Sequence, residues 1–428
     1  MSADRLARYS AALGQLRQKG RLRALKRDTG ADFTSNDYLG LAASAQMRDA
    51  LLAAIERGVP AGAGGSRLLR GNHAEHEALE EEAAAFFGCE RMLYFGSGYA
   101  ANLAILSTLP QRGDLIVYDC LVHASAHEGM KAGKAEMAAV PHNGPDAVED
   151  AIRAWRAAGG MGFPWIVVES LYSMDGDRSA LPALLTIADR HNGFLFIDEA
   201  HATGVHGRGG IGYSAEFEGR DNVIVLHTCG KALGSAGALV GANRVLCDFL
   251  VNRARPFIYS TAPSPLQAAC VRHALGILAS EPERRSRLHA LIDYANGEFS
   301  GRFGMPASGT QILPVIIGDN SRTVRIAERM QVRGFDIRAI RPPTVPAGTA
   351  RLRITITLNV DRPAIGRMMD GLAEAMEEER AWGGTSLSPE QIPASARPSF
   401  RRRWQARSMA ITGSRCNRAS MRRRIARP

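Results

Sequence analysis

The chain alternates short apolar runs with longer segments whose apolar residues recur at helical spacing. Most of the short runs are continuous rather than alternating, which is typical of strands covered on both faces. The repeated order of strand and helix favours a mainly parallel sheet wrapped by helices, an α/β fold. We predict strands over residues 92–95, 115–118, 165–169, 194–198, 223–227 and 238–240.

Glycines mark the expected ends of two helices. A helix over 75–87 should end at Gly88, and a helix over 181–191 should end at Gly193. Glycine is common there because it readily adopts the left-handed conformation that follows a last helical turn.

Composition divides the 428 residues into four expected parts. Residues 1–45 form an N-terminal arm, 46–290 a large domain, 291–383 a smaller C-terminal α/β domain and 384–428 a basic tail. The smaller domain should contain strands in ILPVIIG, GFDIRAIRPPTV and RLRITIT. A hydrophobic content of 45% is enough for more than one core without disulfide bonds.

The formal net charge of +10 arises from the tail. From Gly384 onward the chain has eleven arginines and one acid, so the preceding residues balance to zero. The tail is rich in Arg, Ser and Pro with little periodic apolar content, which predicts disorder. An arm for nucleic acid or an anionic surface is the less favoured alternative, and a nucleic-acid partner is not expected.

Cysteine usage and the N-terminal residues indicate the compartment. The six cysteines are scattered without paired spacings, which favours neither a zinc site nor a disulfide framework. The N-terminal residues are charged and lack the apolar core of a signal peptide, and no run of about eighteen apolar residues occurs. We therefore expect a cytoplasmic protein without a membrane span.

Lys231 is the last of only five lysines, although arginine is used freely to the C-terminus. It follows the predicted strand 223–227 through the short turn Thr228–Gly230. A lysine amine, unlike a guanidinium group, can lose its proton when desolvated and attack a carbonyl to give a Schiff base. The alternative is an ordinary lysine that reaches into solvent at a strand end.

Other polar residues close or follow neighbouring predicted strands. Asp198 ends one strand and His201 follows it, whereas Ser173 and His123 follow two others. In parallel sheets these strand ends meet at one edge, where ligands bind. A helix cap is the alternative for Asp198. His123 and His127 are one helical turn apart, but no further ligands complete a metal site, so we predict no metal and a stacking or hydrogen-bonding role for His123.

The turn GSGYAAN offers the backbone amides of residues 96–98 at the start of a predicted helix over 99–109. Such amides form an anion site suited to a phosphate. Together with Lys231 and Asp198, this site matches pyridoxal 5′-phosphate. The aspartate would pair with the protonated pyridine nitrogen, the amides would hold the phosphate, and the lysine would form the Schiff base. Histidine and serine could reach the phenolic oxygen.

Eight motifs occur in an order and spacing that resemble the α-oxoamine synthases: SNDYLGL, GAGGSRLLRGNHAEHEALE, FGSGYAAN, SMDGD, DEAHATG, TCGKALGSAGA, YSTAPSP and RPPTVPAGTARLRIT. The resemblance covers residues 5–377. It implies a fold type I pyridoxal phosphate transferase that acts as a homodimer with active sites at the subunit interface. The motifs are most similar to the biotin-synthesis branch, an acyltransferase that condenses L-alanine with pimeloyl-CoA or pimeloyl-acyl carrier protein and releases carbon dioxide.

The resemblance also implies the roles of individual residues. Lys231 would hold the cofactor and act in catalysis, and His123 would stack on the ring and contact substrate. Asp198 would hold the pyridine nitrogen. The remaining cofactor contacts would be Ser173 and His201 at the phenolic oxygen, Gly98, Tyr99 and Thr228 at the phosphate, and Ser260 or Thr261 at the phosphate of the neighbouring subunit.

For the substrates, the resemblance implies that Arg23 and Thr344 bind the acyl group and that Arg353 binds the amino acid carboxylate. Arg23 could instead be an exposed residue on an amphipathic arm. Arg353 lies in an alternating run and shares one strand face with Arg351, and that face could equally be solvated.

Two alternatives remain open. One keeps the cofactor but uses glycine, as in 5-aminolevulinate synthase or 2-amino-3-ketobutyrate CoA ligase. RPPTVPAGTARLR resembles the alanine-using branch more than either of these. The other is a noncatalytic binding protein on the same fold, and the presence of Lys231, Asp198 and His201 argues against it.

Overall fold

The computed structural model describes residues 5–382, which divide into two compact units. Unit 1 contains the N-terminal residues up to Ser35, the short segment Met174–Gly176 and the residues from Leu291 onward. Unit 2 contains Asn36–Ser173 and Asp177–Ala290. The predicted division into arm, large domain, small domain and tail stays a prediction, and the tail lies outside the described residues.

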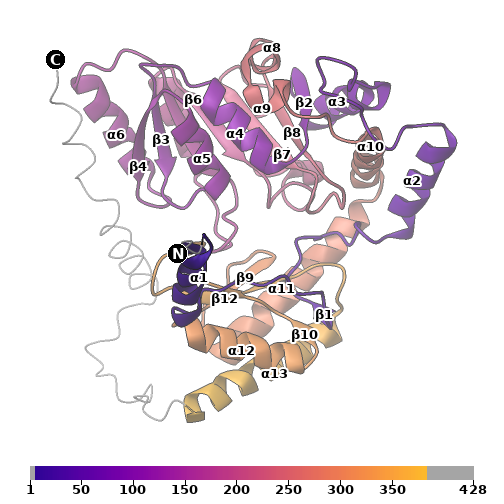
Figure 1. The fold of residues 1–428 in the computed structure, drawn as a ribbon, viewed down its shortest axis with the longest axis vertical. Helices are drawn as coiled ribbons and strands as arrows, with labels where there is room; N and C mark the ends of the chain where they lie inside the picture. Colours follow the sequence, from indigo (N-terminus) through magenta and orange to yellow (C-terminus); the bar gives the residue numbers. More distant parts are fainter. Residues whose placement is uncertain (1–4, 383–428) are drawn as a thin grey trace. The chain divides into compact units, whose positions relative to one another are not determined.

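Unit 2 is built on a seven-stranded sheet with the order β2-β8-β7-β6-β5-β3-β4 (Figure 1). The strands β3 to β7 run parallel, and β8 is antiparallel to both of its neighbours. The predicted mainly parallel sheet is therefore confirmed. Its strands are β2 (Arg91–Phe95), β3 (Leu115–Asp119), β4 (Glu136–Val140), β5 (Pro164–Glu169), β6 (Phe194–Asp198), β7 (Val223–Thr228) and β8 (Ala238–Ala242).

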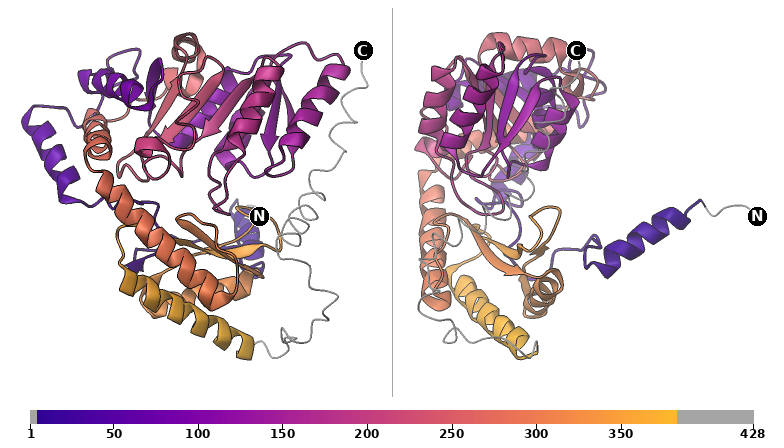
Figure 2. Two further views of the ribbon diagram at one scale, coloured as in Figure 1. Left: turned by 180° about the vertical axis from the view of Figure 1, so that it is seen from behind. Right: turned by 90° about the vertical axis from the view of Figure 1, so that its left-hand side faces the viewer.

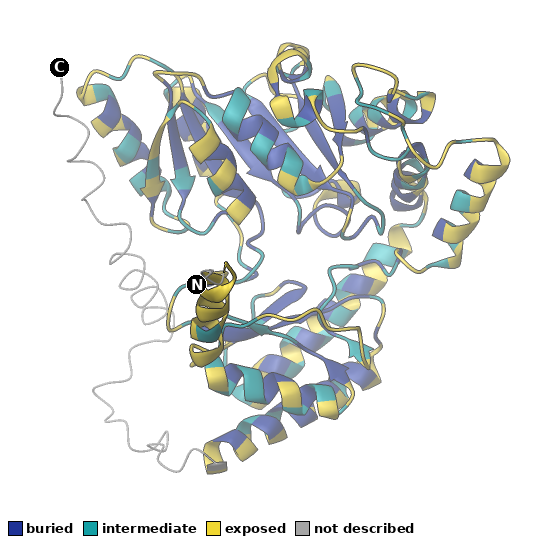
Figure 3. Ribbon diagram, viewed as in Figure 1, coloured by how far each residue is buried: buried dark blue, intermediate teal, exposed yellow. Residues whose placement is uncertain are grey.

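Each central strand is apolar throughout because it serves two cores. Ile224 on β7 belongs to the core on one face of the sheet, and Val225 belongs to the core on the other. Successive residues of a strand point to opposite faces, so a continuous apolar run is needed where both faces are covered. Figure 3 shows the strands as largely buried and the helices as exposed on their outer sides.

The two faces of the sheet are covered by different helices. The first core includes residues of α4 (Gly98–Thr108), α5 (Ala124–Ala132), α8 (Arg244–Arg253) and α9 (Arg255–Ile258). The second core includes residues of α6 (Pro145–Ala157) and α7 (Leu181–Arg190). Unit 2 also contains α2 (Ala45–Glu56), α3 (Ala74–Phe87), η1 (Arg208–Gly210) and α10 (Pro265–Ser280), and α10 packs against α2 and α3.

One of the two predicted helix ends is confirmed and the other is wrong. Helix α3 ends at Gly88, which has a left-handed φ of 81°. After α7 the left-handed residue is Asn192, with a φ of 49°, and not Gly193. A Cβ atom at position 193 would lie 2.5 Å from the carbonyl oxygen of Pro164. Gly193 therefore permits a close approach of two backbone segments rather than a left-handed turn.

Unit 1 contains a three-stranded antiparallel sheet with the order β11-β12-β9, and a two-stranded parallel pair β1-β10. The strands expected in ILPVIIG and RLRITIT are present. Helix α12 packs on β9 and β12, and α13 packs beside α12 (Figure 2). The elements are α1 (Ala7–Gln18), β1 (Ala31–Asp32), β9 (Ile312–Gly318), α12 (Asn320–Val332), β10 (Phe335–Asp336), β11 (Ala339–Ile340), β12 (Ala350–Thr355) and α13 (Arg362–Trp382).

Helix α11 (Pro282–Phe303) contributes residues to both units, since the division of the chain falls after Ala290. Between residues 5 and 382, no helix combines the length and the apolar character needed to cross a membrane.

Candidate functional site

The segment that carries Lys231 is a turn between the antiparallel strands β7 and β8. The backbone N–H of Cys229 donates to the carbonyl of Gly237 at 2.9 Å and closes this turn. Gly234 has a φ of 59°, and a Cβ atom there would lie 2.6 Å from the backbone nitrogen of Ala42. The close packing and the left-handed conformation both require glycine at this position. The fold thus places Lys231 just beyond the carboxyl end of β7, as the sequence predicts.

Lys231 contacts His201, another predicted site residue. The distance from Lys231 Nζ to His201 Nε2 is 2.7 Å, and His201 Nδ1 lies 2.6 Å from the hydroxyl of Tyr38. Tyr38 donates to the amide oxygen of Asn36 at 3.2 Å. One set of donors satisfies these contacts if His201 donates through Nδ1 to Tyr38 and accepts through Nε2 from the lysine.

Sequence analysis assigned no role to Tyr38, although it lies in the SNDYLGL motif. It is fully buried, and a buried tyrosine hydroxyl needs a hydrogen-bonding partner. The motif alone does not show that the partner is His201, which lies 163 residues away in the chain.

Asp198 lies at the carboxyl end of β6 and is 7% exposed. Its Oδ1 atom accepts from the backbone N–H of Ala200 at 3.0 Å, and Oδ2 accepts from Asn102 Nδ2 at 2.9 Å. Residues 200–205 form turns, so the alternative of an α-helix cap is wrong. The two donors instead fix the orientation of a buried carboxylate at the strand end.

Asn102 links Asp198 to His123 through a serine. Its Nδ2 also donates to Ser125 Oγ at 3.0 Å, and that hydroxyl lies 2.7 Å from His123 Nδ1. The backbone N–H of Ser125 donates to the same ring nitrogen, which is therefore an acceptor. Asn102 was missed by sequence analysis; the available signal was a polar amide inside the apolar helix that follows the glycine turn.

Burial favours a neutral ring at His123. Burial lowers the pKa of His123, and the positive charge of Lys231 lowers it further, whereas Asp198 acts in the opposite direction. The electrostatic influence of both groups means that His123, Lys231 and Asp198 lie around one site.

Glu169 is a second buried acid, at the carboxyl end of β5, and sequence analysis missed it. Its Oε2 atom accepts from the backbone N–H of Ser173 at 3.2 Å. Burial raises the pKa of Glu169 to about 8, the charge of Asp198 adds to this effect, and Lys231 opposes it. Glu169 therefore holds a proton at neutral pH beside the predicted site. An acid that closes an apolar strand was the same signal that identified Asp198.

The predicted phosphate site lies at the start of α4. Ser97 caps this helix by accepting from the backbone N–H of Ala100 at 3.1 Å. A Cβ atom at Gly98 would lie 3.7 Å from Thr228 Oγ1, so the first turn of α4 faces the end of β7. Tyr99 is about half exposed. The structure thus brings Gly98 and Thr228 together next to a helix N-terminus that favours an anion.

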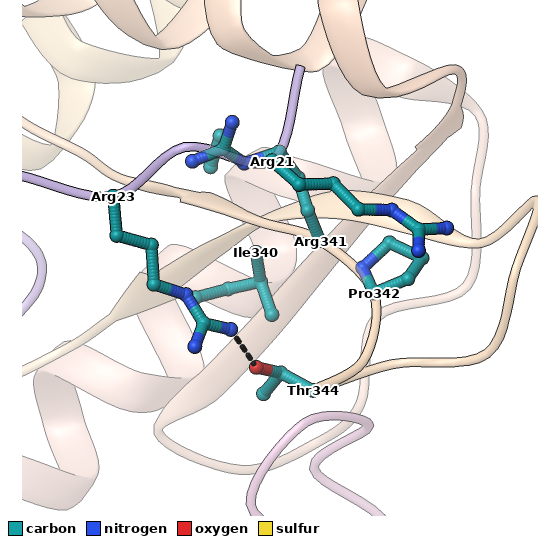
Figure 4. Close-up of a pocket in the computed structure, with 7 residues that line it drawn as sticks. Arg21, Arg23, Ile340, Arg341, Pro342 and Thr344 are labelled. Carbon is teal, nitrogen blue, oxygen red and sulfur yellow. Dashed lines mark hydrogen bonds between the residues drawn. The ribbon is translucent and has the colours of Figure 1, made fainter. Parts of the chain in front are cut away.

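Unit 1 contains a pocket of about 190 Å³ with three arginines in its wall, shown in Figure 4. Arg23 donates to Thr344 Oγ1 at 3.1 Å, so these two predicted acyl-binding residues are neighbours. Arg23 is exposed, as expected for the alternative of an exposed residue on an amphipathic arm. It also lines the pocket. The other lining residues are Arg21, Ala339, Ile340, Arg341 and Pro342.

The pocket carries positive charge, which the charge of Glu328 offsets in part at Arg341. Within residues 5–382, Arg21, Arg23 and Arg341 form no ion pair. The Nε atom of Arg21 is buried and has no hydrogen-bonding partner among these residues. Burial lowers the pKa of Arg341, and the charge of Arg23 lowers it further. An anion with several acceptor oxygens would satisfy these groups.

Arg351 and Arg353 are both buried on β12, at 3% and 7% exposure. The alternative of a solvated strand face is therefore wrong. Arg351 pairs with Asp175 at 2.5 Å, and Arg353 donates to Thr355 Oγ1 at 3.3 Å. The two arginines thus differ in their partners, although they share a strand face.

The arrangement in unit 2 can hold a small molecule with an aldehyde, a cationic ring nitrogen and a phosphate. It supplies an amine at Lys231, a fixed carboxylate at Asp198, a neutral ring at His123 and an anion site at Gly98. No group of three or more His, Cys, Asp or Glu side chains suited to a metal ion occurs in the described part of the chain.

Known proteins resemble this chain over most of its length. Residues 29–371 match the family "Aminotransferase class I and II". The 8-amino-7-oxononanoate synthase of Chromobacterium violaceum is 39% identical over 382 residues, which cover 86% of this chain and 98% of that protein. The 8-amino-7-oxononanoate synthase of Geobacter sulfurreducens is 38% identical and covers 86% of this chain and 97% of the relative.

Solved structures share the fold. The serine palmitoyltransferase of Sphingomonas wittichii superposes with a TM-score of 0.80 over 89% of this chain and 100% of that protein, and its 23% identity supports the fold alone. The crystal structure of 8-amino-7-oxononanoate synthase from Francisella tularensis is 26% identical, with a TM-score of 0.69 over 83% of this chain and 100% of that protein. The predicted fold class and family resemblance are confirmed. The chain belongs to the class I and II aminotransferase family and, within it, to the 8-amino-7-oxononanoate synthases.

Proposed function

We propose that this protein uses pyridoxal phosphate to condense L-alanine with a pimeloyl thioester, releasing carbon dioxide and 8-amino-7-oxononanoate. The observation that carries the proposal is the 2.7 Å contact between Lys231 Nζ and His201 Nε2 beyond β7, beside the fixed carboxylate of Asp198. The two relatives whose names state this activity match this chain over nearly their whole length.

The described residues fit the cofactor. Asn102 Oδ1 and Glu169 Oε1 are buried without hydrogen-bonding partners around Asp198, as expected where a polar group completes the site. Asp198 would hold the ring nitrogen, the amides at Gly98 with Thr228 would hold the phosphate, and His123 would lie against the ring face. When bound, pyridoxal phosphate supplies a carbonyl that links to amines and a cationic ring that stores electrons from the substrate α-carbon.

Lys231 has two expected tasks, to hold the cofactor and to move a proton. Its amine is positioned by His201, which is itself fixed by Tyr38. Once alanine occupies the site, the free lysine amine can remove the α-proton, because the nearby positive charge makes that amine less basic. Burial raises the pKa of Glu169 to about 8, which favours the neutral form of this acid beside the amine.

The arginine pocket of unit 1 is the proposed site for the acyl group. A pimeloyl chain ends in a second carboxylate, and Arg21, Arg23 and Arg341 offer several donors to such an anion. Arg353 is proposed to bind the alanine carboxylate.

The first experiment compares amino acid and acyl donors. We expect the purified protein with pyridoxal phosphate to release free thiol from pimeloyl-CoA in the presence of L-alanine, at a kcat/KM at least about tenfold above that with glycine. A strict glycine requirement with succinyl-CoA or acetyl-CoA would move the assignment to the glycine-using synthases. Unreactive protein without cofactor binding would favour the noncatalytic alternative.

The same assay tests the pocket. We expect Arg341→Gln to lower kcat/KM for pimeloyl-CoA by about 10- to 100-fold, because a charged hydrogen bond contributes roughly 1.5–3 kcal/mol. Heptanoyl-CoA, which lacks the distal carboxylate, should be affected little. Arg333→Gln is the matched control, since Arg333 pairs with Glu378 and does not line the pocket. Equal losses for both acyl chains would contradict a carboxylate site.

The homodimer, the acyl carrier and the location remain proposals. Exposed Leu69 and Tyr259 support a dimer surface near Ser260 and Thr261, because residues 65 and 262 hydrogen-bond to each other. Sedimentation at the mass of one chain would contradict a dimer.

The same assay, run with both donors, tests whether coenzyme A or an acyl carrier protein delivers the pimeloyl group. The cytoplasmic location rests on the sequence.

A further inference from the structure

His142 lies between the edge strand β4 and helix α6, and the proposed reaction gives it no task. Its side chain is 8% exposed. The Nδ1 atom lies 3.0 Å from both carboxylate oxygens of Asp119, and Nε2 lies 2.7 Å from Asp177 Oδ2. One buried imidazole thus connects Asp119, at the end of β3, with Asp177, in the loop that follows β5.

The contacts of His142 with two acids favour an imidazolium ion. An ionised carboxylate only accepts hydrogen bonds, so both ring nitrogens must donate. Burial by itself would lower the pKa of His142, but its hydrogen bonds to Asp119 and Asp177 outweigh this effect and raise the pKa to about 10. Tyr172 packs edge-on against the ring, with 4.4 Å between centroids. These are the titratable groups in contact with the ring.

Asp119 fixes the turn that leads to His123. It ends β3, and its Oδ1 atom accepts from the backbone N–H of Leu121 at 2.8 Å. Its Oδ2 atom accepts from the backbone N–H of Asn143 at 2.7 Å, which ties the same acid to the residue after His142. The position of His123, two residues beyond Leu121, therefore depends on Asp119.

Asp177 closes the loop that carries Ser173. Its backbone carbonyl accepts from the N–H of Tyr172 at 2.9 Å, and its Oδ2 atom accepts from Asn143 Nδ2 at 2.7 Å as well as from His142. The residues between Tyr172 and Asp177 thus form a loop held at its base. Ser173 is the first residue of this loop.

We propose that His142 is a positioning residue that fixes the separation between the turn bearing His123 and the loop bearing Ser173. The inference rests on the proposed function, in which these residues contact the ring face and the phenolic oxygen of one cofactor. His142 touches neither cofactor nor substrate in this role. It acts by holding Asp119 and Asp177, and with them the two segments, at one spacing.

The test is the affinity of the apoprotein for pyridoxal phosphate. We expect His142→Gln to raise the dissociation constant by about 10- to 100-fold, because the amide has no positive charge and donates from one nitrogen, whereas the imidazolium donates from two separate nitrogens, so buried charged hydrogen bonds are lost. The pH at which the visible absorbance of the bound cofactor changes should also shift. Asp177→Asn keeps an acceptor oxygen but removes one charge, so it should raise the same dissociation constant by a smaller factor. This variant replaces His142→Gln in the test if His142→Gln does not fold.

The matched control is His191→Gln. His191 Nε2 contacts Glu149 Oε1 at 2.9 Å in the same unit, and neither residue belongs to the turn or the loop. We expect this variant to lose thermal stability while keeping wild-type cofactor affinity. Wild-type affinity and an unshifted absorbance titration in His142→Gln would overturn the proposal.

A separate readout distinguishes this proposal from the proposed function. In the apoprotein, His142→Gln should speed amide hydrogen exchange in both segments 119–127 and 171–178, whereas His191→Gln should not. If wild-type protein does not bind pyridoxal phosphate, the proposed function fails. The exchange result still tests whether His142 connects the turn bearing His123 to the loop bearing Ser173. Unchanged exchange in either segment would contradict it.

Discussion

Replacing Lys231 with alanine is expected to lower kcat for the condensation of alanine with pimeloyl-CoA by at least about 10⁴-fold, since the residue both holds the cofactor and moves the proton. His201, although its Nε2 atom faces the position that the amine has left, cannot take over the first task, because holding the cofactor as a Schiff base requires a primary amine. Single-turnover rates measure the loss, and the visible absorbance of the bound cofactor should change its position.

The control is Lys131→Ala, which removes an exposed amine paired with Glu128 and should leave the rate unchanged. A small primary amine added to the Lys231→Ala variant should restore part of the proton-transfer rate, because it can occupy the space that the side chain leaves. A variant that keeps more than about a tenth of the wild-type kcat would contradict the assignment of Lys231.

Replacing Asp198 with asparagine is expected to lower kcat by about 10²- to 10³-fold, because a neutral amide cannot stabilise a proton on the pyridine nitrogen in a buried site. The geometry should survive, since an amide oxygen can still accept from Ala200 or Asn102. The loss should therefore appear in kcat more than in the amount of bound cofactor, and a spectroscopic pH titration should show a lower pKa for the ring nitrogen.

Asp189→Asn provides the comparison for this change. Asp189 forms an ion pair with Arg220 at the surface, with both side chains 44% exposed, so we expect little effect of this variant on kcat. If Asp198→Asn loses cofactor while its rate per bound cofactor stays at the wild-type value, Asp198 is a structural residue and the assignment to the ring nitrogen is wrong.

The parts of the fold that could be predicted are those with local signals. The run at β7 is apolar at every position because Ile224 and Val225 face different cores, and this marks a central strand in the sequence itself. The location of Lys231 and Asp198 at one edge of the sheet follows from the rule that parallel strands present their carboxyl ends together. Strand β4 has no such signal, because it lies at the sheet edge and only Val140 of its five residues is buried.

The residues that sequence analysis missed acquire their roles from distant partners. Asn102 meets Asp198 across 96 residues of the chain, and Tyr38 meets His201 across 163. Contacts between residues so far apart in the chain produce no periodic pattern in the sequence. The roles of Arg23, Thr344 and Arg353 also could not be worked out from residue patterns, because arginine and threonine are common on solvated surfaces and only the family resemblance singled them out.

The pairing of β1 with β10 has a consequence for synthesis on the ribosome. Ala31 leaves the ribosome early, but its partner Phe335 follows 304 residues later. At about 5–20 residues per second, the N-terminal segment waits roughly 15–60 s for that partner. Among the described residues, unit 2 ends at Ala290 and can fold during this interval, whereas unit 1 must assemble last. Rare codons or stalling between residues 290 and 335 would therefore lengthen the exposure of the first strand to proteases and chaperones.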